Sequence, residues 1–252
     1  DTNANPANED GLAVTASVAS GPSGATLTSE TVTTGTDGRA VFENLTITGL
    51  VGEYTLEFSS GSLDPVESDT IALGSGGASP SLTTATVPDG TAGVETTISV
   101  QARDANGNDL TSSGGTVAVS VTGANTATAT VTDNQDGTYT AVYTPTIAGS
   151  DNVAITLNGE AIGGSPYSSV VSPGSANASQ SRATVPGGTA GALTTVTVQT
   201  RDAYGNDLTS GGATVAMTVT GANSATADVS DNGDGTYSAS YTPALAGTDN
   251  LA

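Results

Sequence analysis

Residues 117–143 read VAVSVTGANTATATVTDNQDGTYTAVY. Apolar side chains occupy alternate positions in three short runs of this stretch, with Thr or Ser at most positions between them. A period of two places one set of side chains on one face of a β-strand, so the stretch predicts strands and not helices. The Asp136-Gly137 pair before the last run is typical of a hairpin turn.

The same alternation continues on both sides of this stretch. It returns at residues 98–102 and 153–157, and a last short run spans residues 167–171. Gly, Asn, Asp and Pro bound the runs, as they bound strands in all-β domains. Many short strands in a unit of roughly 90 residues are typical of a two-sheet β-sandwich.

Residues 85–154 and 183–252 are near-copies of each other. They align at a constant offset of 98 without a gap, and about 49 of the 70 aligned positions are identical. A repeat of that length is a whole small domain and is too long for a solenoid unit. The chain is therefore predicted to be a tandem array, and arrays usually set length and spacing.

Two short Gly/Ser-rich segments divide the chain into three units. We assign linkers to residues 75–80 and 173–180, and we expect neighbouring units to sit end to end with some hinge freedom. Unit two (residues 81–172) is predicted to be a complete domain.

The two outer units are predicted to be partial. Unit one (residues 1–74) is a different subtype, and its opening residues 1–5 resemble the Asp/Asn loop that follows the second strand in the later units, so its first strands are expected to be missing. Unit three (residues 181–252) is predicted to stop before its last strands. Because a sandwich without an edge strand exposes unpaired backbone groups, we expect the chain to be an excerpt of a longer array.

Composition excludes several functions. The chain has 25 acidic residues, four Arg and no Lys or His, and its formal net charge is -21. This charge argues against nucleic acid or anionic lipid as a partner. No run approaches the roughly 20 apolar residues that a membrane helix needs. The absence of Cys removes disulfides, thiol nucleophiles and thiolate metal sites.

Several motifs resemble known families in their order and spacing. Units two and three carry, in this order, DANGN (104–108) and DAYGN (202–206), DGTY (136–139 and 234–237), and YTP (143–145 and 241–243). Residues 81–252 thereby resemble filamin-type immunoglobulin-like repeats. Unit one, through DGRAVF (37–42), LTI (45–47) and GEYTL (52–56), resembles the immunoglobulin-like modules of bacterial surface proteins and adhesins. The resemblance implies an all-β fold of tandem immunoglobulin-like β-sandwiches, end to end.

Calcium is the one cofactor for which the sequence offers ligands. The Asp/Asn loops present hard oxygen atoms at close spacing, which suit Ca²⁺, although the EF-hand register fails and a self-bonded turn explains the same residues. An inter-domain calcium site with Asp133 or Asp151 nearby would stiffen the array. The candidate ligands are Asp104, Asn106, Asn108 and Asp109 in unit two, and Asp202, Asn206 and Asp207 in unit three.

Other sites are sparser. Asn44 and Asn177 begin glycosylation sequons, and Asn177 is the better candidate because it falls in a linker. Tyr204 stands at a loop tip, where an exposed ring can anchor a partner. No catalytic residues are predicted, because a Ser or Thr nucleophile has no His, Cys or Lys beside it. The chain is not expected to be an enzyme.

The favoured function is structural. We interpret the chain as a stalk or filament segment of a large extracellular prokaryotic surface protein, which spaces or projects a functional tip. Its expected partners are neighbouring immunoglobulin-like domains of the same longer chain or fibre. One alternative is an adhesive module that recognises a surface receptor or polysaccharide. A second alternative is a subunit that polymerises by strand addition.

Overall fold

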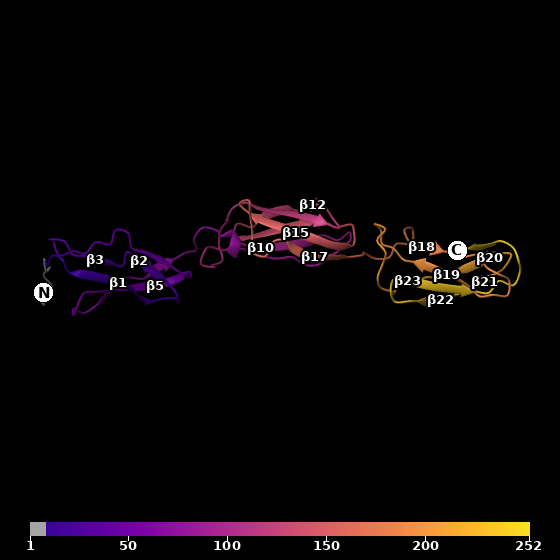
Figure 1. Cartoon of the computed structure of the whole chain (residues 1–252), viewed down its shortest axis with the longest axis horizontal. Coiled ribbons are helices and arrows are strands. Elements are labelled where there is room, and N and C mark those ends of the chain that lie inside the picture. The colour runs from indigo at the N-terminus through magenta and orange to yellow at the C-terminus, as the bar shows by residue number, and fades with distance from the viewer. Residues whose placement is uncertain (1–8) are drawn as a thin grey trace.

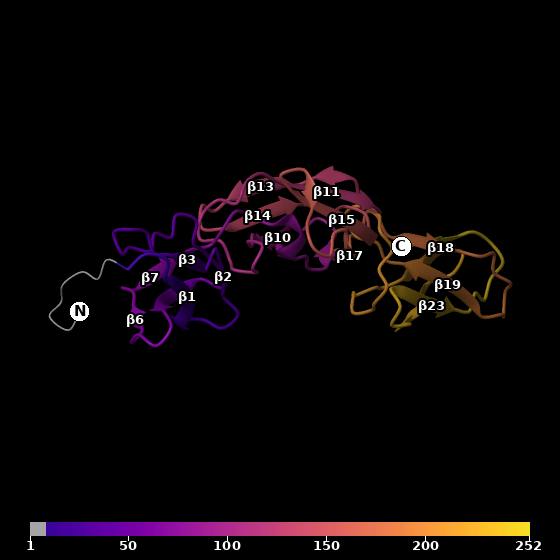
Figure 2. The same cartoon turned by 60° about the vertical axis from the view of Figure 1, so that its left-hand side comes forward.

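The computed structural model describes residues 9–252, so the predicted loop at residues 1–5 lies outside the described residues. Strands dominate, and they form three separate bodies in a row (Figure 1). A second view shows that the row is curved, with the middle body raised between its neighbours (Figure 2). We describe them in turn as units one, two and three.

Unit one is built on two long strands, β1 (Ala13–Ser20) and β5 (Gly52–Ser59), which pair antiparallel. Tyr54, which belongs to β5, is fully buried. Residues 40–42 lie outside the strands of this unit, and the Phe42 ring packs edge-on against Phe58 with centroids 5.3 Å apart. The remaining strands are β2 (Thr26–Thr28), β3 (Thr31–Thr33), β4 (Thr46–Thr48), β6 (Val66–Glu67) and β7 (Ile71–Leu73).

Unit two is a two-sheet sandwich. One sheet has the order β13-β14-β10-β8 and the other has the order β12-β11-β15-β17-β9, with β16 paired to β15. A short 3-10 helix, η1 (Pro80–Leu82), leads into the first strand. The strands are β8 (Thr84–Thr86), β9 (Gly90–Thr91), β10 (Thr96–Gln101), β11 (Val117–Gly123), β12 (Ala127–Thr128), β13 (Thr130–Asp133), β14 (Thr138–Tyr143), β15 (Gly149–Leu157), β16 (Glu160–Ala161) and β17 (Tyr167–Ser172).

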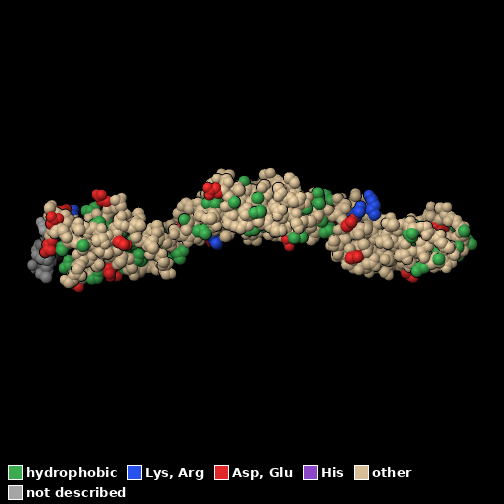
Figure 3. All heavy atoms as spheres, in the orientation of Figure 1, with side chains coloured by type: hydrophobic (Ala, Val, Ile, Leu, Met, Phe, Trp, Pro, Cys, Tyr) green, Lys and Arg blue, Asp and Glu red, His purple; other side chains and the backbone are tan. Residues whose placement is uncertain are grey.

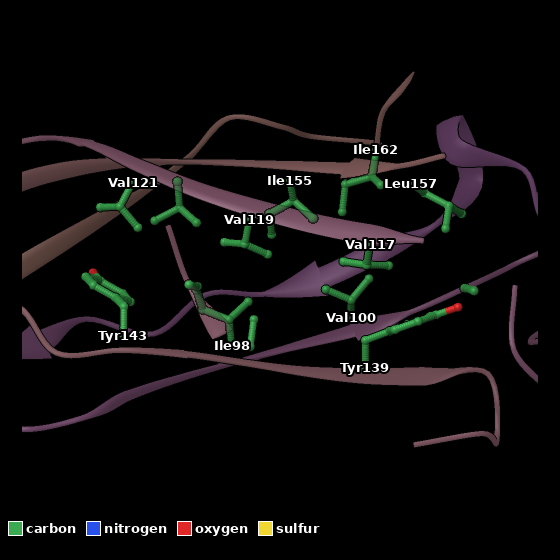
Figure 4. Close-up of a cluster of buried hydrophobic side chains, with 14 of the residues drawn as sticks. Ile98, Val100, Val117, Val119, Val121, Tyr139, Tyr143, Ile155, Leu157 and Ile162 are labelled. Atoms are coloured by element: carbon green, nitrogen blue, oxygen red, sulfur yellow. The ribbon is translucent and has the colours of Figure 1, made fainter. Parts of the chain in front are cut away.

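The core of unit two comes from the alternating positions. Side chains of β11, β15 and β10 interdigitate between the two sheets (Figure 4). Burying one such Val, Ile or Leu side chain contributes about 1.5–3 kcal/mol. Tyr139 closes one end of the core, where its hydroxyl donates to the Gly115 carbonyl at 2.8 Å and accepts from the Gly114 amide at 2.8 Å. The predicted inward faces are confirmed.

One predicted run is divided between the sheets. The alternation at residues 127–131 suggests a single strand, but β12 pairs with β11 in one sheet and β13 pairs with β14 in the other. The chain crosses at Ala129, a small buried residue whose amide donates to the Val119 carbonyl at 3.0 Å. The hairpin predicted at Asp136-Gly137 joins β13 to β14, and only glycine fits at Gly137, since a Cβ would lie 1.8 Å from the Leu110 carbonyl oxygen.

Unit three repeats this architecture with a smaller core. Its sheets have the orders β18-β19-β23-β22 and β21-β20-β24. Ala239 is fully buried, and the hydroxyl of Tyr237, the counterpart of Tyr139, accepts from the Ala213 amide at 2.8 Å. The strands are β18 (Arg182–Thr184), β19 (Thr194–Gln199), β20 (Thr218–Gly221), β21 (Ala225–Thr226), β22 (Asp228–Asp231), β23 (Thr236–Tyr241) and β24 (Asp249–Leu251).

Candidate functional site at the junctions between units

Each later unit meets the preceding one through the loop that we name its Asp–Asn loop: residues 104–108 in unit two and 202–206 in unit three. In the first of these loops, Asp104 Oδ1 accepts hydrogen bonds from the backbone amides of Asn106 (2.8 Å) and Asn108 (3.0 Å). The Asp104 amide in turn donates to the Asn108 carbonyl at 3.0 Å. Gly107 has a φ of +82°, which glycine adopts without strain. The sequence thus folds this loop around one carboxylate.

The second oxygen of Asp104 fixes the linker. Asp104 Oδ2 accepts from the Gly76 amide at 2.8 Å and from Asn108 Nδ2 at 2.9 Å. Burial alone would raise the pKa of Asp104, but hydrogen bonds from the Asn108 side chain and from the backbone amides of Gly76, Asn108 and Asn106 outweigh it and lower the pKa to about 2. The residue is only 1% exposed. The hinge freedom predicted for this linker is therefore restricted at Gly76.

Asn108 carries the contact into unit one. Its Oδ1 accepts from the Val51 amide at 2.8 Å, and its Nδ2 donates to the Gly49 carbonyl at 3.1 Å. Together with the bond to Asp104, these contacts use both amide hydrogens and the carbonyl oxygen of a buried side chain. Only backbone atoms of unit one take part. We name residues 49–51 the end loop of unit one.

The contacts of Asp202 at the second junction repeat those of Asp104 at the first. Asp202 Oδ1 accepts from the amides of Tyr204 and Asn206, both at 2.9 Å, and its Oδ2 accepts from the Gly174 amide at 2.8 Å and from Asn206 Nδ2 at 2.7 Å. Burial, which raises the pKa of Asp202, is again outweighed by these hydrogen bonds, so the pKa is lowered.

Asn206 reaches the end loop of unit two, residues 145–149. Its Oδ1 accepts from the Ala148 amide and its Nδ2 donates to the Thr146 carbonyl, both at 2.9 Å. In both junctions, the bound carbonyl and the bound amide belong to residues two positions apart.

A buried polar network holds the end loop of unit two in shape. Asn125 Oδ1 accepts from the amides of Thr146 (2.9 Å) and Ile147 (3.0 Å). Asn125 Nδ2 donates to both oxygens of Asp151, which is fully buried and also accepts from the Tyr143 hydroxyl at 3.3 Å. Satisfied networks of this kind rigidify a structure. The loop therefore presents the Thr146 carbonyl and the Ala148 amide to Asn206 in a fixed geometry.

Tyr204 adds an aromatic contact at the second junction only. It lies over Gly93 of unit two, where a Cβ would come within 2.5 Å of Tyr204 Cε2. The side chain remains 53% exposed. The sequence suggested that this ring anchors a partner, and the structure places it against the preceding unit of its own chain. Asn106 occupies the same position in the first loop.

The predicted calcium ligands are brought together only in part. The oxygens of Asp104 and Asp202 are each occupied by two hydrogen bonds. Asp109 and Asp207 turn away and pair with Arg103 (2.7 Å) and Arg201 (2.6 Å). Within residues 9–252, no group of three or more acidic side chains is gathered as a metal site would require. Calcium at these loops stays a prediction, and the structure shows hydrogen bonds in place of converging ligands.

The two acidic residues named as neighbours of such a site have separate contacts. Asp151 belongs to the network beneath the end loop of unit two. Asp133 Oδ1 accepts from the Gln135 amide at 2.8 Å within the β13–β14 hairpin.

The two sequons differ in their exposure. Asn44 is exposed, whereas Asn177 is half-buried and its Oδ1 accepts from the amide and the hydroxyl of Ser179. Glycosylation at either residue stays a prediction. In the part of the chain that the structure describes, no helix is long and apolar enough to cross a membrane.

Sandwich units joined in single file through their loops define a tandem repeat protein. The chain belongs to the filamin repeat family: the Filamin/ABP280 repeat matches residues 77–168 and 175–251. These matches confirm the predicted resemblance for units two and three.

Two filamins are among its curated relatives. Filamin-C of Mus musculus is 36% identical over 122 residues, which is 46% of this chain and 4% of the relative. Filamin-C of Rattus norvegicus is 35% identical over the same shares. The chain thus spans only about 4% of the length of the curated relatives it matches.

A solved bacterial structure aligns with nearly the whole chain. FdeC, described as an Escherichia coli adhesin, aligns with a TM-score of 0.54 at 23% identity and covers 98% of this chain and 82% of its own. At that identity the likeness shows the fold, and unit one is included in it. The all-β tandem sandwich predicted from the sequence is confirmed.

Proposed function

We propose that this chain is a spacer segment of a large extracellular surface protein. In this segment, the hydrogen bonds of Asn108 and Asn206 hold neighbouring sandwich units at fixed angles. The observation that carries the proposal is the repetition of one junction. Asn108 and Asn206 bind backbone atoms of the unit before them in the same way, although those units belong to different subtypes. Junctions that do not bend freely keep the array extended, which suits a protein that must hold a distant part away from its base.

The surface is compatible with this role. Acidic side chains are spread over the face seen in Figure 3 and do not gather into one patch. A net charge of -21 favours mutual repulsion of neighbouring chains and keeps an extended molecule soluble. The likeness of the whole chain to a bacterial adhesin supports a place at the cell surface.

Small-angle scattering tests the spacer role. The native chain should give the profile of one extended, narrowly distributed shape. The double variant Asn108→Ala, Asn206→Ala should keep the circular dichroism spectrum of folded strands. Its scattering should become that of folded units joined by flexible linkers. A profile that is equally flexible before and after substitution would contradict the proposal.

Glycan and receptor arrays address the adhesive alternative. A spacer gives no specific signal when the native chain is applied to such arrays. Saturable binding to one glycan or receptor, with an affinity retained by the double variant, would assign the chain to recognition instead.

A further inference from the structure

The end loop of unit three, residues 243–247, has the same internal support as that of unit two. Asn223 Oδ1 accepts from the amides of Ala244 (2.8 Å) and Leu245 (2.9 Å). Asn223 Nδ2 donates to both oxygens of Asp249, which also accepts from the Tyr241 hydroxyl at 3.1 Å. Each of these residues stands 98 positions after its counterpart in unit two.

The Asn side chain of each Asp–Asn loop binds backbone atoms of the end loop and none of its side chains. Asn108 binds Gly49 and Val51, whereas Asn206 binds Thr146 and Ala148. These end loops share no side chain, and the loop of unit one is held differently, by the Tyr54 hydroxyl on the Leu50 carbonyl at 2.7 Å. What the two end loops have in common is a carbonyl and an amide two residues apart.

Unit three offers this pair at Ala244 and Ala246, the counterparts of Thr146 and Ala148. Ala148 is half-buried at the second junction, whereas Ala246 is exposed. Within residues 9–252 the Ala246 amide donates no hydrogen bond, whereas the Ala148 amide donates to Asn206. A rigid, outward-facing donor and acceptor pair is therefore displayed at this end of the chain.

A second feature of the docking surface is also present. Gly191, the counterpart of Gly93, has nearly the same backbone conformation, with φ of +83° against +82°. At Gly93 the Tyr204 ring fills the space above the glycine, but at Gly191 nothing would lie within 4 Å of an added Cβ. The surface of unit three thus has room for the aromatic residue that Tyr204 supplies at the second junction.

We propose that the end loop of unit three is a third docking site, and that its partner is the Asp–Asn loop of a further filamin-type unit. The incoming Asn donates to the Ala244 carbonyl and accepts from the Ala246 amide. This inference rests on the proposed function of the two existing junctions and extends it to a surface that neither of them uses.

The test extends the chain in register. Because residues 249–252 correspond to residues 151–154, residues 155–173 are appended after Ala252, followed by a second copy of residues 76–172. The appended unit is then a complete copy of unit two with its own Asp–Asn loop. Amide hydrogen exchange at Ala246 is measured by NMR and compared with exchange at Ala148. One net hydrogen bond should slow exchange at Ala246 by about two- to tenfold.

Two matched variants isolate the docking contact. The first carries Asn108→Ala in the appended copy only, and the second ends after the appended residues 155–173, so that no further unit follows. Ala246 should exchange rapidly in both. Equal exchange at Ala246 in the full extension and in its Asn108→Ala form, with the strand amides of the appended unit protected, would overturn the proposal.

The existing junction serves as the internal reference. The Ala148 amide should be protected from exchange in the native chain and in each extended form. It should lose this protection only in the variant Asn206→Ala. If Ala148 exchanges as rapidly as Ala246 in the native chain, the proposed function fails. If only Ala246 stays rapid in the full extension, the proposed function stands and the third site is rejected. An appended unit that does not fold is replaced by a copy of residues 174–252 followed by residues 155–172, which carries Asn206 and supplies the Tyr204 ring for Gly191.

Discussion

The side chain of Asn206 donates to the Thr146 carbonyl at 2.9 Å across a separation of 60 residues, and thereby joins two units that share no strand. The same side chain is held by Asp202, whose carboxylate also binds the linker at Gly174. Loop, linker and preceding unit are thus fixed by one pair of residues. Asp104 and Asn108 do the same at the first junction.

Acid should loosen the first junction through Asp104. Its pKa of about 2 lies below the ordinary value of 3.8. A lowered pKa means that this carboxylate stabilises the folded state at pH values above 3.8, and that the contribution is lost as the pH falls from 3.8 towards 2. The shift corresponds to about 2 kcal/mol. The Gly76 amide proton, which donates to Asp104, should change its chemical shift over that range.

The variant Asp104→Asn provides the control for this titration. It should weaken the junction at neutral pH, because an amide group cannot accept all four hydrogen bonds, and it should remove the acid-dependent change at Gly76. A Gly76 shift that titrates identically in the variant would show that another group is responsible.

Gly93→Ala should open the second junction. The new Cβ would lie 2.5 Å from Tyr204 Cε2, and the residue would also bear the cost of a left-handed backbone, about 1–2 kcal/mol. Gly191→Ala is the matched control, since it has the same backbone cost and nothing within 4 Å. The NMR signals of the Tyr204 ring and the thermal stability of each variant would be measured. Equal effects of the two variants on Tyr204 would contradict the contact.

Asn125→Ala should destabilise unit two by about 1–3 kcal/mol, because it removes the side-chain amide that donates to both oxygens of buried Asp151 and leaves only the backbone amide of residue 125. Asn223→Ala removes the corresponding side chain from the more exposed network of unit three and should cost less. Denaturant unfolding followed by residue-resolved NMR would separate the two units. A larger loss from Asn223→Ala would indicate that burial does not govern the network.

Much of the fold is predictable because its signal is local. The alternation at Val117, Val119 and Val121 reports burial directly, and all three are 7% exposed or less. The division of residues 127–131 between two sheets is not predictable, since the alternation is unbroken there. It depends on how Ala129 bonds to Val119, a contact between strands.

The junctions are only half predictable. The sequence marks both Asp–Asn loops as self-bonded turns, and Asp104 bonds its own loop as such turns do. It does not indicate where Asn108 reaches, because its partners in unit one are the backbone atoms of Gly49 and Val51, which leave no side-chain pattern. The available signal was that the two loops repeat at offset 98, while the end loops they contact differ in sequence.

Distance measurement across the second junction tests the central claim most directly. The chain has no natural cysteine, so Ser99→Cys and Thr197→Cys place one spin label on an exposed strand position of each unit. Pulsed electron–electron double resonance between the two labels should give a narrow distance distribution in the otherwise native chain. Asn206→Ala should broaden it, and Asn108→Ala, at the other junction, should leave it unchanged. A distribution of the same width with and without the Asn206 side chain would contradict the account.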